Sequence, residues 1–341
     1  MNSLGRRGGA SIALTMLVLA SACAGGSSDK VGGGSGDAGR TELVLAAAAT
    51  AGPGFDSVIE GFRDSEAGAD WTVTGSYGAS GDQSRKVAQG MPVDVMSFSV
   101  QPDMERVVDA GVVDSTWDDG ATRGVPFGSV VALVVREGNP LGIHGWDDLL
   151  RTGVDVVTPD PRSSGSAMWN MLAPYAAKSD GGRDEQAGLD YIRALVSEHV
   201  TARPSSARAA TDLFLPGSGD VLSSYENEAI PVERDGADVE HVVPQQNIRI
   251  DEPFAVSARS GHSDGARAFM NYLYSTDGQR RFSRSGFRPV DPGVAAEFAD
   301  EFPQPERLYT TSDLGGWPTL YPELFEGDSG VITAIYADAT R

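Results

Sequence analysis

The sequence predicts an α/β protein built around parallel β-sheet, and three observations support that fold class. Short apolar runs of strand length recur along residues 41–258, and segments of helical character separate them. Gly, Pro and Ser are frequent between a run and the segment that follows it. Strands that alternate with helices in this way are typical of a parallel sheet covered by helices. The 341 residues, 40% of them hydrophobic, are enough for two domains or for one domain of two lobes.

The first half of the chain contains four such apolar runs. Residues 42–48, 71–77, 93–99 and 128–136 are expected strands, because each is a short apolar run bounded by turn residues. The helical segments between and after them lie at about 55–63, 82–87, 103–110 and 146–150.

The second half continues the alternation. Expected strands cover residues 153–159, 220–225, 241–245 and 253–258, and expected helices cover 166–177, 266–274, 278–285 and part of 321–336. In open α/β sheets, ligands bind outside the carboxyl ends of the strands, where loops meet helix N-termini. Binding residues are therefore expected in the loops that follow the strands.

The N-terminus predicts export. Basic residues precede an apolar run at 12–19, and three small residues then lead to Cys23, the only cysteine. This pattern predicts a signal peptide over residues 1–22, because the apolar run is too short for a comfortable membrane span. The position of Cys23 resembles the lipobox of bacterial lipoproteins, which predicts lipidation and a Gly/Ser-rich tether over 23–40. The alternative is an ordinary cleavage site followed by an unrelated cysteine.

Charge and motif content exclude several functions. The formal net charge of −21 argues against general nucleic-acid binding, which requires a basic surface. The four histidines and single cysteine show no metal-ligand spacing, so no metal and no cofactor are expected. No G-x-S-x-G elbow accompanies a histidine motif, so we do not expect a hydrolase or another enzyme.

Three loops share one design, in which small residues stand between a strand and a helix. They are Ser76–Gly81, Ser163–Ser166 and Ser205–Arg208. Small side chains allow a ligand to approach backbone N–H groups, and a helix N-terminus favours an anion. Each loop alone could be an ordinary capped helix start. The three together favour an anion site.

Specific strings give the chain a family resemblance. "TPDPRSSG" at 158–165, "YENEA" at 225–229, "YLYSTDGQRRFSRSGFRPVD" at 272–291 and "LGGW" at 314–317 resemble the sulfate-binding proteins of ABC importers. The resemblance implies the type II periplasmic-binding-protein fold, two α/β lobes joined by two crossover hinge segments. It places residues 41–126 and 257–341 in the first lobe and 127–256 in the second, with the ligand between them.

The resemblance also implies which residues hold the anion. The expected ligand-binding residues are Ser80, Ser164, Gly165, Ser166, Ala207 and Tyr225, with long-range attraction from Arg208. Three positions depart from the family pattern: Ser166 replaces a usual Gly, Tyr225 a usual Trp, and Asp82 a usual Lys. We interpret Asp82 as a solvated residue of a first helical turn.

The donor-rich loops favour sulfate, which carries no proton near neutral pH and needs hydrogen-bond donors only. Tyr225 leaves thiosulfate, or a tetrahedral metal oxyanion such as molybdate, as alternatives. A non-transport interaction lipoprotein or a hydrolase is a more distant alternative. The resemblance implies an ABC permease and its ATPase as partners, a monomeric binding protein, and a location in the periplasm or on the outer face of the cell membrane.

Overall fold

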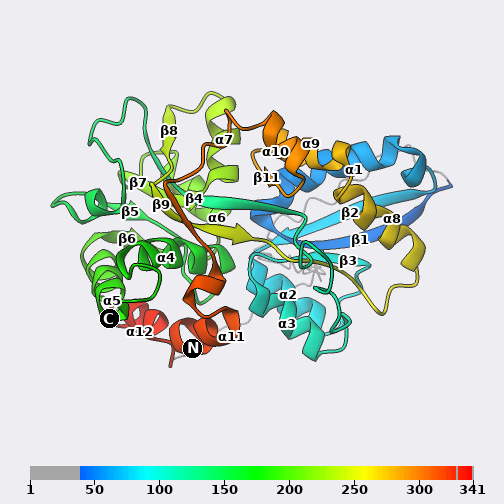
Figure 1. Cartoon of the computed structure of the whole chain (residues 1–341), viewed down its shortest axis with the longest axis horizontal. Helices are drawn as coiled ribbons and strands as arrows, with labels where there is room; N and C mark the ends of the chain where they lie inside the picture. The colour runs from blue at the N-terminus through cyan, green and yellow to red at the C-terminus, as the bar shows by residue number, and fades with distance from the viewer. Residues whose placement is uncertain (1–38, 328, 340–341) are drawn as a thin grey trace, which may run out of the picture. The chain divides into compact units, whose positions relative to one another are not determined.

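The computed structural model describes residues 39–327 and 329–339, which form two β-sheets covered by helices (Figure 1). The expected signal peptide and Cys23 lie outside the described residues. The first sheet has the strand order β10-β3-β1-β2. Its strands are β1 (Thr41–Ala48), β2 (Trp71–Gly78), β3 (Val95–Ser97) and β10 (Phe254–Val256).

The second sheet has the order β12-β9-β4-β7-β5-β6, and β8 and β11 also pair with β4. Its strands are β4 (Phe127–Arg136), β5 (Val156–Val157), β6 (Val200–Ala202), β7 (Val221–Tyr225), β8 (Val239–Val242), β9 (Gln246–Asp251), β11 (Arg288–Pro289) and β12 (Arg307–Tyr309).

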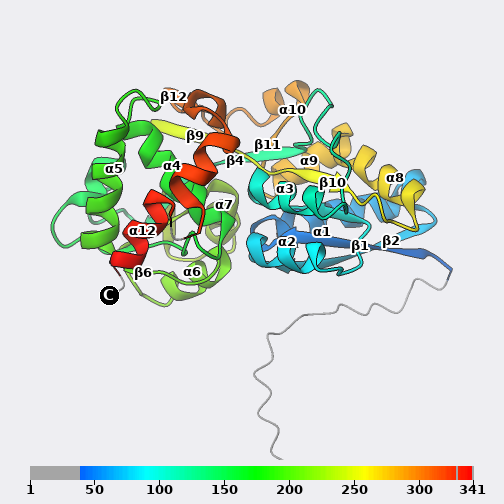
Figure 2. The same ribbon diagram turned by 90° about the horizontal axis from the view of Figure 1, so that it is seen from below.

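Helices cover both sheets, as Figures 1 and 2 show. Near the first sheet lie α1 (Gly52–Asp64), α2 (Ser80–Ala88), α3 (Gln101–Asp109), α8 (Ser263–Leu273), α9 (Thr276–Arg284) and α10 (Pro292–Glu297). Near the second lie α4 (Gly165–Lys178), α5 (Glu185–Ala194), α6 (Ala207–Phe214), α7 (Glu226–Arg234), α11 (Trp317–Leu320) and α12 (Val331–Asp338). A short helix, η1 (Ala49–Ala51), follows β1, and another, η3 (Trp146–Leu150), follows β4. No described helix is long and apolar enough to cross a membrane.

Aromatic residues fill the core on one face of the first sheet. Phe55 of α1 packs edge-on against Phe127 and Phe282, with ring centroids 5.6 Å apart in each pair. In the second core, Trp169 of α4 meets Trp317 of α11 edge-to-face at 5.1 Å. These fully or nearly fully buried rings anchor α1 and α4 in their cores.

The prediction of parallel sheet is only partly correct, because both sheets are mixed. β1 pairs in parallel with β2 and β3, and β5 pairs in parallel with β6 and β7. β4, however, is antiparallel to β7, β8 and β9, and β10 is antiparallel to β3. The exceptions involve the segments that cross between the sheets. β4 begins with Phe127 in the first core and continues with Val131 in the second, and β9 leads back to β10.

The C-terminal segment differs from the expected lobe boundaries. Residues 257–341 were all expected in the first lobe, but β12 pairs with β9 of the second sheet. Trp317, Leu320 and Tyr336 are buried in the second core. The reason is packing: Trp317 of α11 meets Trp169 edge-to-face, and Tyr336 of α12 is buried in the same core.

Candidate functional site

The loops that carry Ser80 and Gly165 meet at Ser99, which follows β3. The Ser99 N–H donates to Ser80 Oγ at 2.9 Å, and the Trp169 indole donates to the Ser99 carbonyl at 2.6 Å. A Cβ placed on Gly165 would lie 3.0 Å from Ser99 Cβ and 3.3 Å from Ser80 Cβ. The N-terminus of α4 therefore abuts the N-terminus of α2, although the two helices belong to different sheets.

A second close approach explains the small residues in both loops. A Cβ on Gly81 would lie 3.3 Å from the carbonyl oxygen of Ser163. Larger side chains at Gly81 or Gly165 would push the two loops apart. The small residues therefore allow the two loops to pack closely; the expected approach of a ligand to their backbone N–H groups stays a prediction.

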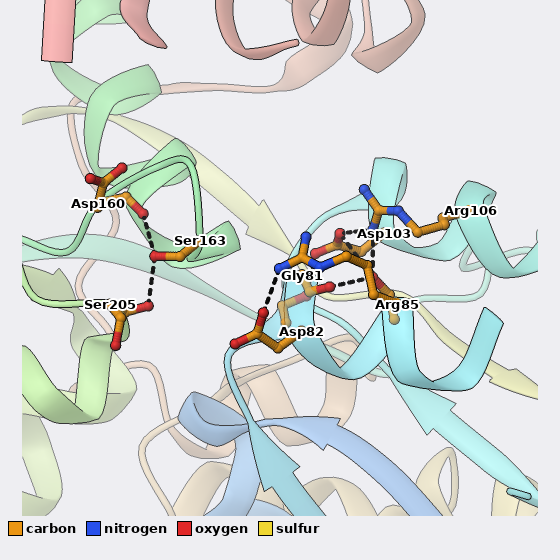
Figure 3. A network of polar contacts seen from close by, with 10 residues as sticks. Gly81, Asp82, Arg85, Asp103, Arg106, Asp160, Ser163 and Ser205 are labelled. Atoms are coloured by element: carbon orange, nitrogen blue, oxygen red, sulfur yellow. Dashed lines mark hydrogen bonds and ion pairs between the residues drawn. The ribbon is translucent and has the colours of Figure 1, made fainter. Parts of the chain in front are cut away.

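Hydrogen bonds also join the α4 loop to the α6 loop. Ser163 Oγ donates to the carbonyls of Ser205 at 2.9 Å and Asp160 at 3.3 Å (Figure 3). Ser206 caps α6 by accepting from the Ala209 N–H at 3.2 Å. Helix α6 in turn packs against η1 at the end of β1. The loop that carries Ala207 therefore lies beside both its own sheet and the first one.

The first amides of α4 and α6 have no acceptor within the described residues. The N–H groups of Gly165, Ser166 and Ala207 make no hydrogen bond there. Ser164 Oγ and Ser166 Oγ lie 2.7 Å apart, so these hydroxyls bond to each other. Unpaired helix N-terminal amides carry the positive end of the helix dipole, so this edge of the second sheet can bind an anion.

The Ser80 side chain is held by its own lobe. Its hydroxyl donates to Asp103 Oδ2 at 2.5 Å, and Asp103 is ion-paired with Arg106 (Figure 3). In this arrangement the Ser80 hydroxyl proton points to Asp103. Its donation to a ligand requires that this bond be exchanged. The Ser80 residue itself lies where it was expected, beside Gly165.

Tyr225 ends β7 and is fully buried. Burial, followed by the negative charge of Glu252, raises the pKa of its phenol well above the usual value, so the phenol stays protonated. The hydroxyl lies toward Ser99 but completes no hydrogen bond of good geometry within the described residues. It is therefore available as a donor.

Two charged residues of the sequence analysis lie at the surface. Asp82 forms an ion pair with Arg85, and both are about half exposed (Figure 3). This agrees with the interpretation of Asp82 as a solvated first-turn residue. Arg208 is exposed too, and its charge acts on Glu228. Its long-range attraction for a ligand remains a prediction.

Four residues of this region were not predicted. Ser99 joins the α2 and α4 loops, as described above. Asn227 Nδ2 donates to the carbonyl of Thr50 in η1 at 3.1 Å, and Thr50 Oγ1 donates to Glu252 Oε1 at 3.4 Å. "YENEA" contained a signal for Asn227, whereas Thr50 and Glu252 stand in no motif.

Metal ligation finds no support in the described part of the chain, where no group of three His, Cys, Asp or Glu residues could hold an ion. Two α/β lobes, segments that cross between them, and helix N-termini that converge from both sheets define the class. These are the features of a solute-binding protein.

The comparisons with known proteins agree with that class. The family described as "Bacterial extracellular solute-binding protein" matches residues 43–288. A sulfate-binding protein of Synechococcus elongatus is 34% identical over 330 residues, covering 94% of this chain and 93% of the relative. The sulfate-binding protein of Escherichia coli is 33% identical over 273 residues, covering 76% and 82%. The chain therefore belongs to the sulfate-binding protein family of bacterial extracellular solute-binding proteins.

A solved structure confirms the fold. The sulfate-binding protein SubI from Mycobacterium tuberculosis is 57% identical, with a TM-score of 0.83, covering 84% of this chain and 100% of that one. A substrate-binding protein of an Agrobacterium tumefaciens ABC transporter shares the fold at 15% identity and a TM-score of 0.68. These relatives are named as binding proteins, which confirms the expectation that the chain is not an enzyme.

Proposed function

We propose that this protein captures sulfate outside the cytoplasm and delivers it to an ABC permease. The observation that carries the proposal is that the amides of Gly165, Ser166 and Ala207 and the buried hydroxyl of Tyr225 make no hydrogen bond within the described residues. All are donors, as a proton-free dianion requires. The relatives named as sulfate-binding proteins support the choice of anion.

The arrangement relies on dipoles rather than on an opposing charge. Nearby cations are already paired, Arg106 with Asp103 and Arg85 with Asp82. About five to seven hydrogen bonds to a charged ligand, at about 1.5–3 kcal/mol each, give a gross gain on the order of 10–20 kcal/mol. Ordering and lobe closure subtract several kcal/mol, so we expect a dissociation constant in the micromolar range or below.

Thiosulfate is the second candidate. A thiosulfate-binding protein of Pseudomonas aeruginosa is 31% identical over 295 residues, covering 83% of this chain and 87% of the relative. Tyr225, where the sulfate-binding family usually has Trp, is the residue most able to alter the choice.

A competition titration tests the proposal. Sulfate, thiosulfate, molybdate and phosphate would be titrated calorimetrically at two pH values. We expect sulfate to bind in the micromolar range or tighter, and phosphate to bind at least about 100-fold more weakly, because the amides and the phenol proposed to hold the anion donate hydrogen bonds and offer no charged acceptor for the phosphate proton. Preference for phosphate would contradict the proposal, as would failure of all four anions to bind.

A lipid-modified tether completes the proposal. We propose that Cys23 becomes the lipidated N-terminus and that the monomeric binding domain is held at the membrane by residues 23–40. The mass of the protein from membranes should exceed that of the chain from Cys23 by a lipid modification. Replacement of Cys23→Ser should release the protein from the membrane. A membrane-bound C23S protein of unmodified mass would contradict this.

A further inference from the structure

Two buried carboxyls, Glu252 and Glu228, act electrostatically on the phenol of Tyr225, one of the proposed binding residues, and take no part in the function described so far. Glu252 is 1% exposed and Glu228 is 7% exposed. Within the described residues, the Oε2 atom of each lacks a hydrogen-bond partner. Buried carboxyls with unsatisfied oxygens are unusual, because burial without a partner strongly disfavours the charged form.

Glu252 lies in a segment that crosses between the two lobes. It stands between β9 of the second sheet and β10 of the first, where the chain crosses from one lobe to the other. Its Oε1 accepts from Thr50 of η1, and η1 packs against the α6 helix that carries Ala207. Glu252 therefore lies in a crossing segment and contacts η1, which packs against the helix that carries Ala207.

The groups that face Glu252 offer it no counter-ion. They are the Tyr225 phenol of β7, the Thr50 hydroxyl of η1 and the Glu228 carboxyl of α7. Its chain neighbour Asp251 is paired with Arg249. Burial, and then the negative charge of Glu228, raise the pKa of Glu252 to about 8 despite the Thr50 hydrogen bond.

Glu228 has a different environment. Burial raises its pKa to about 7, the charge of Arg208 opposes this rise, and Asp212 adds to it. The remaining acid of this turn, Glu226, is fully buried but is paired with Arg288 at 2.6 Å. Of these carboxyls, Glu252 thus has the least compensation for a negative charge.

A bound dianion would add a second negative charge to this neighbourhood. An ionised Glu252 would repel it through a poorly screened interior, whereas a neutral carboxyl would not. We propose that Glu252 is a proton-binding selectivity residue, neutral whenever the dianion is bound, so that anion capture takes up a proton from solution. The inference rests on the proposed function and names a residue that adjusts it to pH.

The consequence is a defined pH dependence. Below pH 7, Glu252 is already protonated in the free protein, so the affinity for sulfate should not depend on its titration. As the pH rises above about 8, the dissociation constant should increase by up to tenfold per pH unit, since each capture then requires one proton. An ionised Glu252 would instead accept a hydrogen bond from hydrogen phosphate and favour that anion over sulfate.

The experiment is calorimetric titration with sulfate at pH 8.5, in two buffers of different ionisation enthalpy, which gives the number of protons taken up. We expect the wild-type protein to take up between about half a proton and one proton. Glu252→Gln should lose most of that uptake and bind sulfate with a nearly pH-independent dissociation constant. Glu228→Gln should keep most of it, and Asp82→Asn, which alters an exposed pair near the α2 loop, should resemble the wild type.

The outcomes separate the two proposals. Tight sulfate binding by the wild type with no proton uptake would overturn the role of Glu252 and leave the proposed function intact. Undiminished uptake in the Glu252→Gln protein would also overturn it. If that variant does not fold, the wild-type proton count and the Glu228→Gln protein still decide. Absence of sulfate binding by the wild type at every pH would overturn the proposed function itself.

Discussion

A single added methyl group at Gly165 should weaken anion binding without unfolding the protein. In the Gly165→Ala variant, the new Cβ would lie 3.0 Å from Ser99 Cβ and 3.3 Å from both Ser80 Cβ and Val100 Cγ2. These distances are shorter than ordinary carbon–carbon contacts, so the α4 loop must withdraw from the first lobe. Overpacking of this kind costs about 1–3 kcal/mol.

Because the strained contact joins the two lobes, the penalty should fall on the closed, ligand-binding arrangement. The dissociation constant for sulfate should rise about 5- to 150-fold, measured by calorimetry. Gly145→Ala is the control, because a Cβ there would meet nothing within 4 Å. The melting temperature of the ligand-free Gly165→Ala protein should stay close to that of the wild type. Unchanged sulfate affinity would show that capture does not require the two loops to touch.

Three further perturbations follow from the same geometry. Tyr225→Phe should weaken sulfate binding about 10- to 150-fold, because one hydrogen bond to a charged ligand is lost. The urea-unfolding free energy should change little, since the hydroxyl has no hydrogen-bond partner within the described residues; equal sulfate affinity would remove Tyr225 from the site. Arg288→Met should lower the unfolding free energy by about 3–5 kcal/mol and the melting temperature with it, because it leaves Glu226 charged and buried. The control Arg280→Met, at an exposed ion pair, should hardly change the melting temperature, and equal melting temperatures of the two variants would contradict this prediction. Because the pKa of Glu252 is raised, the native state binds more protons than the unfolded state, so the ligand-free protein should lose stability as the pH rises from about 4.5 to about 8. In urea unfolding, the unfolding free energy of Glu252→Gln should vary less with pH than that of the wild type, and an equal pH dependence would contradict the raised pKa of Glu252.

The local patterns in the sequence were sufficient to predict most of the strands. The apolar runs at 42–48, 71–77 and 128–136 coincide closely with β1, β2 and β4, because each is bounded by turn residues. β6 and β12, with three residues each, are too short to carry a periodic signal. Strand direction could not be predicted from the sequence either, since the antiparallel pairing of β4 with β7 and of β10 with β3 depends on where the chain crosses between the sheets.

The site shows the same division. The small residues of the α2 and α4 loops predicted that a ligand approaches their backbone N–H groups; the contact of Gly165 with Ser80 and Ser99 was not predicted. Glu252 could not be found this way, because "DEP" is an ordinary loop string and its burial results from the hinge. Contacts between lobes depend on residues far apart in the chain, as Thr50 and Glu252 are, and no local pattern encodes them.

The most direct test is the location of a bound dianion in crystals grown with selenate, whose selenium gives an anomalous signal. Neutral donors from two lobes should surround it, with the amides of Gly165, Ser166 and Ala207 and the Tyr225 hydroxyl of the second lobe at hydrogen-bonding distance from its oxygens, and Ser80 of the first lobe facing them. A selenium peak elsewhere would contradict the account, for instance next to Arg259 and His262 in the cavity of about 690 Å³ at the N-terminal end of β1.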